Sequence, residues 1–264
     1  MNSKTTFSIN KQAIADSFSK AAKRYDQFAQ LQRDIGVQLL TYVTRQDPDK
    51  ILDLGCGTGH FSEKLCKMYP ACQMISLDIS DAMLAQVDKK QLPQISCLQA
   101  DIDNLPFTGE RFDLIFSNLV VQWSEDLGSC LKQLKESLNA GGTLCFSTLI
   151  DGTLHELTQA WKAVDQHPHT NTFLSLDTVE KVLQQCGLKK LSIKTETRIL
   201  HYENVIEVMR ALKGIGANHV HNQQPLAIKG YKLLRQLEKG YAPFVNKQGQ
   251  LNLTYQVCYI EAEK

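Results

Sequence analysis

Hydrophobic positions recur with two different periods along the chain. Near the N-terminus they follow helical spacing, which predicts an amphipathic helix over residues 11–29 and a second helix over about 30–45. Short apolar runs then alternate with helical stretches, and the runs are predicted strands at residues 50–54, 74–78, 96–100, 112–117 and 143–149. Such alternation is typical of parallel strands joined by right-handed crossovers in a doubly wound α/β sheet.

The pattern is looser in the second half of the chain. A helix over 125–138 is expected to end at Gly141-Gly142, where a strand starts. A helix from Asp177 is expected to begin with a capping box, because Glu180 stands three residues later. The remaining predicted elements are helices over 154–164, 204–213 and 226–240 and strands over 188–200 and 251–260.

Together these elements predict an α/β fold. We expect a mostly parallel, seven-stranded, Rossmann-like sheet with N-terminal helices and a helical lid insertion. Residues 1–45 form the predicted helical cap, 46–150 the ligand-binding core, and 151–264 the rest of the sheet with the lid, all in one structural unit. Long insertions near the carboxyl edge of such a sheet usually cover a substrate.

Composition adds a few bounds. The 264 residues are 43% hydrophobic, enough to bury one substantial core. No apolar run approaches the roughly 18–20 residues of a membrane helix, and the N-terminus has no apolar signal core, so we expect a soluble cytosolic protein. The eight cysteines are scattered without a C-x-x-C pair, which favours reduced, buried thiols.

Charge is unevenly distributed although the net charge is only +1. Residues 1–33 carry six basic against two acidic side chains, residues 34–184 carry eleven against twenty, and residues 185–240 carry ten against four. The basic segments therefore either attract an acidic macromolecule, such as nucleic acid or an acidic carrier protein, or form ordinary solvated helix faces.

A glycine-rich loop, Asp53-Leu54-Gly55-Cys56-Gly57-Thr58-Gly59, follows the first predicted strand. Glycines let the backbone turn tightly and approach a ligand without Cβ clashes. Asp78 ends the next strand, nineteen residues beyond Gly59, where a carboxylate can accept hydrogen bonds from both ribose hydroxyls. The loop is therefore predicted to bind a nucleoside-containing cofactor.

The glycine spacing distinguishes between two such cofactors. A dinucleotide-binding loop needs a third glycine three residues after the second, and His60 occupies that position. The spacing favours S-adenosylmethionine, with adenine beside Asp101 and Ile102 after the third strand and the methionine end beside Asn118. The alternative is that the aspartates merely cap helices and turns.

Several segments outside this core resemble the malonyl-[acyl-carrier protein] O-methyltransferase family of bacterial biotin synthesis. The most particular are Ser117-Asn118-Leu119-Val120-Val121-Gln122-Trp123 and the stretch 209–217, and others lie at 10–15, 31–33, 160–165 and 168–173. Thr58 stands where some relatives have proline, which should not affect binding through backbone amides. The resemblance implies methylation of the free carboxylate of malonyl on the phosphopantetheine arm of acyl carrier protein, with S-adenosylhomocysteine as product.

The resemblance also implies site residues, because the first helix of the family folds over the cofactor. Tyr25 would lie near the methionine end and Gln32 or Arg33 near its carboxylate. The complete predicted cofactor site is Tyr25, Gln32, Asp53, Gly55, Cys56, Gly57, Gly59, Asp78, Ile79, Met83, Asp101, Ile102 and Asn118. Some relatives are fused to an esterase; this sequence has no Gly-x-Ser-x-Gly elbow, so a separate esterase is expected to act later.

The chemistry should depend on positioning. A malonyl carboxylate is already ionised at neutral pH, so no general base is needed. Arg210 is the leading candidate to hold it, with Lys213 one turn away, and Tyr25, Gln122 and Trp123 are wall candidates. An exposed arginine at a helix end and a plain core tyrosine are the alternatives.

No metal is expected. The pairs His167/His169 and His219/His221 lack further ligands nearby.

The carrier protein could dock on either of two basic groups. One is Lys20, Lys23 and Arg24, and the other is Lys229, Lys232, Arg235 and Lys239. Three other functions stay open at this point: methylation of another small acid or a quinone, a nicotinamide-dependent oxidoreductase, and a non-catalytic cofactor-binding partner.

Overall fold

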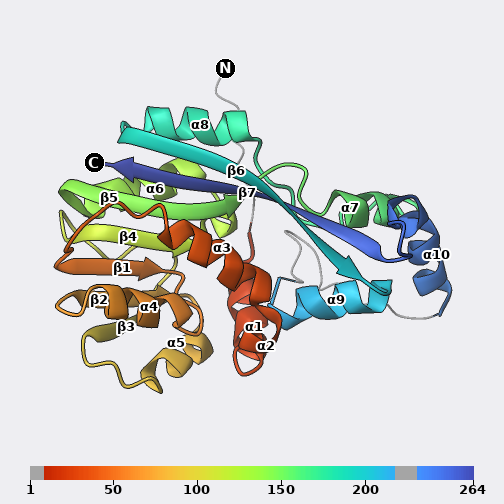
Figure 1. Cartoon of the computed structure of the whole chain (residues 1–264), viewed down its shortest axis with the longest axis horizontal. Helices are drawn as coiled ribbons and strands as arrows, with labels where there is room; N and C mark the ends of the chain where they lie inside the picture. The colour runs from red at the N-terminus through yellow and green to blue at the C-terminus, as the bar shows by residue number, and fades with distance from the viewer. Residues whose placement is uncertain (1–8, 218–230) are drawn as a thin grey trace.

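The computed structural model describes residues 9–217 and 231–264, without the side chains of residues 190, 191, 231 and 232. A single seven-stranded sheet has the order β3-β2-β1-β4-β5-β7-β6 (Figure 1). Its strands are β1 Lys50–Leu54, β2 Gln73–Asp78, β3 Ile95–Gln99, β4 Phe112–Asn118, β5 Leu138–Leu149, β6 Lys189–Tyr202 and β7 Leu251–Glu263. All neighbours pair in parallel except β7, which is antiparallel to β5 and β6. The predicted doubly wound, mostly parallel sheet is confirmed.

Helices cover both faces of the sheet and bury it completely at its centre. Ile51 packs in one apolar cluster with α3 (Gln30–Leu40) and α4 (His60–Met68), whereas Leu52 packs in a second cluster with α6 (Leu127–Ser137) and α8 (Leu176–Gln185). The side chains of Ile51 and Leu52 are both fully buried, as expected for a central parallel strand with helices on both faces of the sheet. α5 (Asp81–Asp88) lies at the β2–β3 end of the sheet.

The lid is built on the far end of the β6–β7 ribbon. Figure 1 shows α7 (His155–Lys162), α9 (Val205–Gly214) and α10 (Tyr231–Tyr241) to the right of the sheet, where this ribbon extends beyond it. The buried carboxylate of Glu156 accepts hydrogen bonds from the backbone and side chain of Thr254, and the Tyr241 hydroxyl donates to the Asn252 carbonyl at 2.8 Å. These contacts fix the lid helices to β7.

The N-terminal helix differs from its prediction. The expected helix over 11–29 is two helices, α1 Lys11–Ala21 and α2 Tyr25–Phe28, because the backbone leaves helical geometry at Arg24 (φ −122°, ψ −1°). The break lets Phe18 and Phe28 pack against glycines at the end of α9. A Cβ on Gly214 would lie 2.3 Å from the Phe28 ring, and one on Gly216 would lie 2.9 Å from Phe18. The next helix ends at Leu40 rather than near residue 45.

Two further boundaries were predicted wrongly. α8 begins with Ser175 as its N-cap, whose hydroxyl accepts from the Thr178 backbone N–H at 3.2 Å, so the expected capping box at Asp177 does not form. Asp177 instead pairs with Lys181 one turn later at 2.6 Å. Strand β5 starts at Leu138, before the two glycines, and the register shifts where they occur. The glycines therefore lie within an irregular strand and do not start it.

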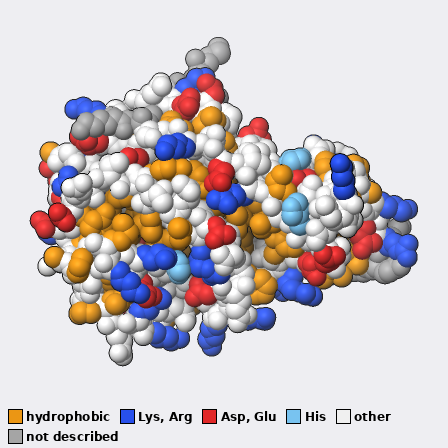
Figure 2. Space-filling view, in the orientation of Figure 1, with side chains coloured by type: hydrophobic (Ala, Val, Ile, Leu, Met, Phe, Trp, Pro, Cys, Tyr) orange, Lys and Arg blue, Asp and Glu red, His pale blue; other side chains and the backbone are white. Residues whose placement is uncertain are grey.

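All eight cysteines are free, and six of them are buried. In the part of the chain that the structure describes, no helix is long and apolar enough to cross a membrane. Figure 2 shows Lys and Arg side chains along the lower edge of one face, below the α1–α2 segment and α9.

Candidate active site

Two adjoining cavities lie at the carboxyl ends of the parallel strands. The first, here the loop cavity, occupies about 630 Å³ beside the glycine-rich loop. Nine predicted cofactor residues line it: Tyr25, Gly55, Gly57, Asp78, Ile79, Met83, Asp101, Ile102 and Asn118. The structure thus brings together residues that are spread over almost a hundred positions of the sequence.

The glycine-rich loop needs its glycines for conformation. Gly55, Gly57 and Gly59 all have positive φ, at 69°, 54° and 77°. A Cβ on Gly55 would also lie 2.3 Å from the Val120 side chain, whereas one on Gly57 would meet no protein atom within 4 Å. The loop backbone is therefore packed against the fourth-strand loop at Gly55 and open toward the cavity at Gly57.

Asp78 lines the loop cavity and is only 7% exposed. Its Oδ2 accepts from the Gly57 backbone N–H and its Oδ1 from the Ser80 backbone N–H, both at 2.9 Å. Burial raises the pKa of Asp78 to about 6. Since each carboxylate oxygen can accept more than one hydrogen bond, both remain able to bind ligand hydroxyls.

Three predicted cofactor residues line neither cavity. Asp53 is buried behind the loop, where its Oδ2 accepts from the Ser62 hydroxyl at 2.5 Å, and burial raises its pKa to about 7. Cys56 packs in a small apolar cluster beneath the loop, and Gly59 is the N-cap of α4. These residues shape the loop without facing the cavity.

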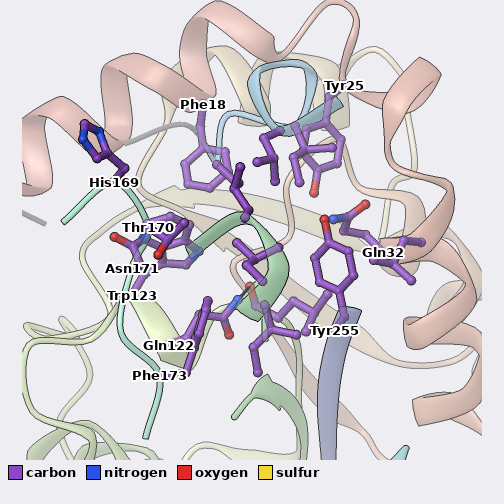
Figure 3. A pocket seen from close by; sticks show the side chains of 18 residues that line it. Phe18, Tyr25, Gln32, Gln122, Trp123, His169, Thr170, Asn171, Phe173 and Tyr255 are labelled. Atoms are coloured by element: carbon purple, nitrogen blue, oxygen red, sulfur yellow. Dashed lines mark hydrogen bonds between the residues drawn. The ribbon is translucent and has the colours of Figure 1, made fainter. Parts of the chain in front are cut away.

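The second cavity, here the lid cavity, occupies about 850 Å³ between the sheet and the lid (Figure 3). Its walls come from α1, α2, α3, the loop after β4, the end of β5, the α7 segment, the loop 169–173, the α9 segment and β7. Phe18, Tyr25, Leu119 and Trp123 line both cavities, so they border the junction where the two cavities meet. A molecule in one cavity would therefore lie next to a molecule in the other at this junction.

The junction between the cavities is held in a strained conformation. Leu119 has a positive φ of 58°, which is costly for a branched side chain. Ser147 stabilises it, because its carbonyl and its hydroxyl accept from the Leu119 N–H at 3.1 and 3.0 Å. The Ser147 hydroxyl also donates to Asn118 Oδ1 at 2.8 Å, while Asn118 Nδ2 donates to the Gln32 carbonyl at 2.9 Å. Backbone strain at this point aims the wall residues into both cavities.

The lid cavity has mostly apolar walls with several polar side chains, among them Gln32, Gln122, Asn171 and Tyr255. Gln122 Nε2 donates to the Leu119 carbonyl at 2.8 Å, and the buried Gln32 Oε1 has no hydrogen-bond partner among the described residues. Burial, with the charge of Asp78 as a smaller cause, raises the pKa of Tyr25 far above its ordinary value, so its hydroxyl stays protonated. None of the described lining residues is Lys, Arg, Asp or Glu.

Arg210 and Lys213 do not lie where they were predicted. Helical periodicity turns Leu212 and Ile215 of this segment toward the lid cavity, whereas Arg210 and Lys213 are exposed on another face of α9 and line neither cavity. Because neither residue lines a cavity among the described residues, the contact of Arg210 with a substrate carboxylate stays a prediction.

The histidines and the basic groups lie away from the loop cavity. His169 stacks on Trp161 and pairs with Asp165 at 2.8 Å, and it lines the edge of the lid cavity. No group of three His, Cys, Asp or Glu residues suited to a metal ion occurs among the described residues. Lys20, Lys23, Arg24, Arg235 and Lys239 are exposed, while His219, His221, Lys229 and the side chain of Lys232 lie outside the described residues.

Sequence reasoning missed Lys11, which lines the loop cavity and forms ion pairs with Asp101 and Asp103. The stretch 10–15, which contains Lys11, resembles the family, but that resemblance does not indicate a role for the lysine. Nothing in the local sequence indicates a partner ninety residues away.

Comparison with known proteins identifies the family. The model of a methyltransferase domain matches residues 52–146. The malonyl-[acyl-carrier protein] O-methyltransferase of Serratia marcescens is 38% identical, over 95% of this chain and 95% of its own length. The enzyme of the same name from Hamiltonella defensa is 36% identical, over 96% and 94%. The chain belongs to the malonyl-[acyl-carrier protein] O-methyltransferase family.

Other relatives differ in length or only share the fold. The biotin biosynthesis bifunctional protein of Teredinibacter turnerae is 36% identical over 97% of this chain, which spans 47% of that protein. Among solved structures, a Bacillus halodurans putative methyltransferase superposes with a TM-score of 0.61 at 16% identity, covering 88% of this chain and 99% of its own. A Haemonchus contortus phosphoethanolamine N-methyltransferase in complex with S-adenosyl-L-methionine gives 0.59 at 17% identity, covering 93% and 57%. This family member therefore has the fold of S-adenosylmethionine-dependent methyltransferases.

Proposed function

We propose that this protein transfers a methyl group from S-adenosylmethionine to the free carboxylate of malonyl-[acyl-carrier protein], giving the methyl ester and S-adenosylhomocysteine. One observation carries the proposal: in a member of this family, a cavity lined by carboxylates adjoins a mostly apolar cavity at a junction bordered by four shared residues. That arrangement suits a donor and an acceptor that must meet in line.

The loop cavity fits the cofactor. Asp78 would accept from the ribose hydroxyls, Asp101 and Ile102 would flank adenine, and the loop backbone at Gly57 offers open space. Toward the methionine end, Asn118 lies on the wall of the loop cavity. Gln32 lines the adjoining lid cavity, and its buried Oε1 lacks a donor that a ligand ammonium group at the junction would supply. When bound, the cofactor supplies an electrophilic methyl group on a positively charged sulfur.

The lid cavity suits an anionic nucleophile that has left water. A malonyl carboxylate is ionised at neutral pH, so it needs no general base. The described walls contain no Lys, Arg, Asp or Glu, so no salt bridge through both oxygens lowers the nucleophilicity of the carboxylate. Its charge is lost on methylation, and an apolar cavity favours a step that removes charge.

Tyr25 is our candidate for orienting this carboxylate. It lines both cavities, and its protonated hydroxyl can donate to one carboxylate oxygen while the other faces the methyl group. Gln122 and Trp123 would form the opposite wall and exclude water. This assignment replaces Arg210 with a neutral donor at the junction.

The carrier protein would dock on the basic face near α9. Arg210 and Lys213 are exposed there together with Ile206, which is 48% exposed despite its apolar side chain. α9 packs against α2 through Gly214 and Phe28, so Lys20, Lys23 and Arg24 belong to neighbouring elements. An acidic carrier would be attracted by these cations, and a separate esterase would act on the product later.

Mass spectrometry of malonyl-carrier protein incubated with the enzyme and S-adenosylmethionine tests the proposal. We expect a methyl group added to the acyl end. Methylation of free acids or quinones alone would instead establish a small-molecule methyltransferase. Binding of NADH without affinity for S-adenosylmethionine in calorimetry would establish an oxidoreductase, and cofactor binding without turnover on any acceptor would establish a non-catalytic partner.

A further inference from the structure

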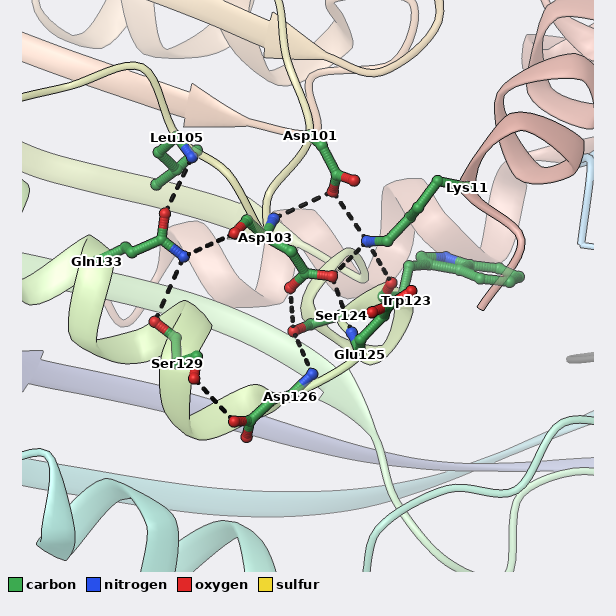
Figure 4. Close-up of polar contacts among 10 residues, drawn as sticks. All are labelled: Lys11, Asp101, Asp103, Leu105, Trp123, Ser124, Glu125, Asp126, Ser129 and Gln133. Atoms are coloured by element: carbon green, nitrogen blue, oxygen red, sulfur yellow. Dashed lines mark hydrogen bonds and ion pairs between the residues drawn. The ribbon is translucent and has the colours of Figure 1, made fainter. Parts of the chain in front are cut away.

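Lys11, the first residue of α1, joins three segments at one end of the loop cavity (Figure 4). Its Nζ lies 2.8 Å from Asp101 Oδ1 and 2.6 Å from Asp103 Oδ2, both in the segment after β3. It also donates to the Trp123 carbonyl at 3.0 Å, in the loop after β4. One ammonium group thus uses its donors on two carboxylates and a carbonyl.

This cluster is well shielded from solvent. The side chains of Lys11, Asp101 and Asp103 are 18%, 29% and 21% exposed. No other described cation pairs with either aspartate. Removal of Lys11 would therefore leave two adjacent carboxylates without a countercharge, and their repulsion would turn Asp101 away from its present orientation.

The contacts of Asp101 are divided unequally between its two oxygens. Oδ1 accepts from Lys11 and from the Asp103 backbone N–H at 3.0 Å. Oδ2 receives no hydrogen bond or ion pair from the described residues, although Asp101 lines the loop cavity. The occupied oxygen fixes the side chain, and the second oxygen stays available as an acceptor for a donor in the cavity.

Lys11 also fixes the helix that covers both cavities. α1 carries Phe18, which lines the loop cavity and the lid cavity. A second contact ties α1 to the core, since the Ser19 and Ser80 hydroxyls lie 2.8 Å apart. The ion pairs of Lys11 are stronger than this neutral hydrogen bond, so they hold the N-terminal end of the cover in place.

We propose that Lys11 is a positioning residue: it holds Asp101 so that the free oxygen selects a purine that carries an exocyclic amino group, and it closes α1 over that purine. This inference rests on the proposed function for the identity of the ligand. An amino group donates to a carboxylate, whereas the carbonyl oxygen of a hypoxanthine would face it as a second acceptor. We therefore expect the protein to bind the adenine-containing ligand more tightly than its deaminated, hypoxanthine-containing counterpart.

Isothermal calorimetry with S-adenosylhomocysteine and S-inosylhomocysteine tests this role directly. The wild type should bind the adenosyl ligand about tenfold or more tightly than the inosyl ligand, since a hydrogen bond to a charged group contributes about 1.5–3 kcal/mol. Lys11→Met should weaken adenosyl binding and bring the two affinities to within about threefold of each other. Lys11→Arg, which keeps the charge, should restore most of the difference.

The controls separate this inference from a merely structural role and from the proposed function. Lys181→Met removes a lysine that also pairs with a carboxylate at 2.6 Å but is 65% exposed on α8, and it should change neither affinity. Thermal unfolding without ligand checks that Lys11→Met folds, and Lys11→Gln is the milder replacement if it does not. Unchanged adenosyl-over-inosyl preference in the folded variant would overturn the inference alone. A wild type that binds neither ligand would overturn the proposed function with it.

Discussion

The two cavities are built in opposite ways. The loop cavity is lined by three charged residues, Asp78 at the end of β2, Asp101 after β3 and Lys11 of α1, whereas the lid cavity is mostly apolar and takes its walls from nine separate parts of the chain. Most of the donor site can thus be formed by a few residues at the ends of neighbouring strands, whereas the acceptor site depends on how distant elements pack. Changes at the loop cavity should therefore be severe and local, and changes at the lid should alter selectivity.

The largest effect is expected from Gly55→Ala. The new Cβ would lie 2.3 Å from Val120 on a backbone at φ 69°, so the loop must move and S-adenosylmethionine affinity should fall by about a hundredfold or more in calorimetry. Gly109→Ala is the matched control, because Gly109 has φ 72° but a Cβ there would meet nothing within 4 Å. It should cost about 1 kcal/mol of stability and leave affinity unchanged. Equal affinities for both variants would contradict a packed loop.

Tyr25→Phe should separate the two cavities functionally. Loss of the hydroxyl removes the proposed donor to the carboxylate but keeps the ring that walls both cavities. We expect kcat to fall by about 10–100-fold, while the Kd for S-adenosylmethionine changes by less than about threefold. Equal losses in both quantities would instead assign Tyr25 to the cofactor.

Cofactor affinity should depend on pH through Asp78. In the free protein burial raises the pKa of Asp78 to about 6, and the ionised form is the better acceptor for ribose hydroxyls. Affinity should therefore be level above that pH and fall by up to about tenfold per unit below it, with proton release on binding. Asp53, Tyr25 and Cys56 are the neighbouring titratable groups.

Two variants assign this dependence. Asp78→Asn should bind weakly with a flat pH profile. Asp53→Asn should keep the fall below pH 6, because Asp53 faces Ser62 and lines neither cavity. If the affinity of Asp53→Asn did not depend on pH, the pH dependence of the wild type would be assigned to Asp53 instead of Asp78.

The smallest effect is expected on the outer face of α9. Reversing both charges in Arg210→Glu/Lys213→Glu should raise the KM for malonyl-carrier protein by about three- to tenfold and reduce its salt dependence. Turnover of malonyl-pantetheine, which lacks the carrier, should stay unchanged, as should the Kd for S-adenosylmethionine. If turnover of malonyl-pantetheine were lost as well, Arg210 would be assigned to binding of the substrate carboxylate. Lys181→Glu on α8 is the control.

The sequence allowed the loop cavity to be predicted closely. Strand ends and glycine spacing are local signals, and Asp78 and Asp101 follow from where β2 and β3 end. Lys11 was missed because its partners lie ninety residues or more away. Arg210 was predicted in the substrate site on resemblance, and only the packing of α9 showed which of its faces is buried. The break at Arg24 accompanies the packing of Phe18 and Phe28 against Gly216 and Gly214, which lie almost two hundred positions later in the sequence.

The ribbon of β6 and β7 has a consequence for redesign. These two strands are continuous from the sheet into the lid, and they pair over twelve registered positions, from Lys189 and Glu263 in the sheet to Tyr202 and Leu251 at the lid end. The lid therefore cannot be exchanged for another by joining two chains at a surface loop. A chimaera with a new acceptor range would have to take both strands, and with them the edge of the sheet, from the same parent. Selection for new acceptors in this architecture should accordingly proceed by side-chain changes within the lid cavity.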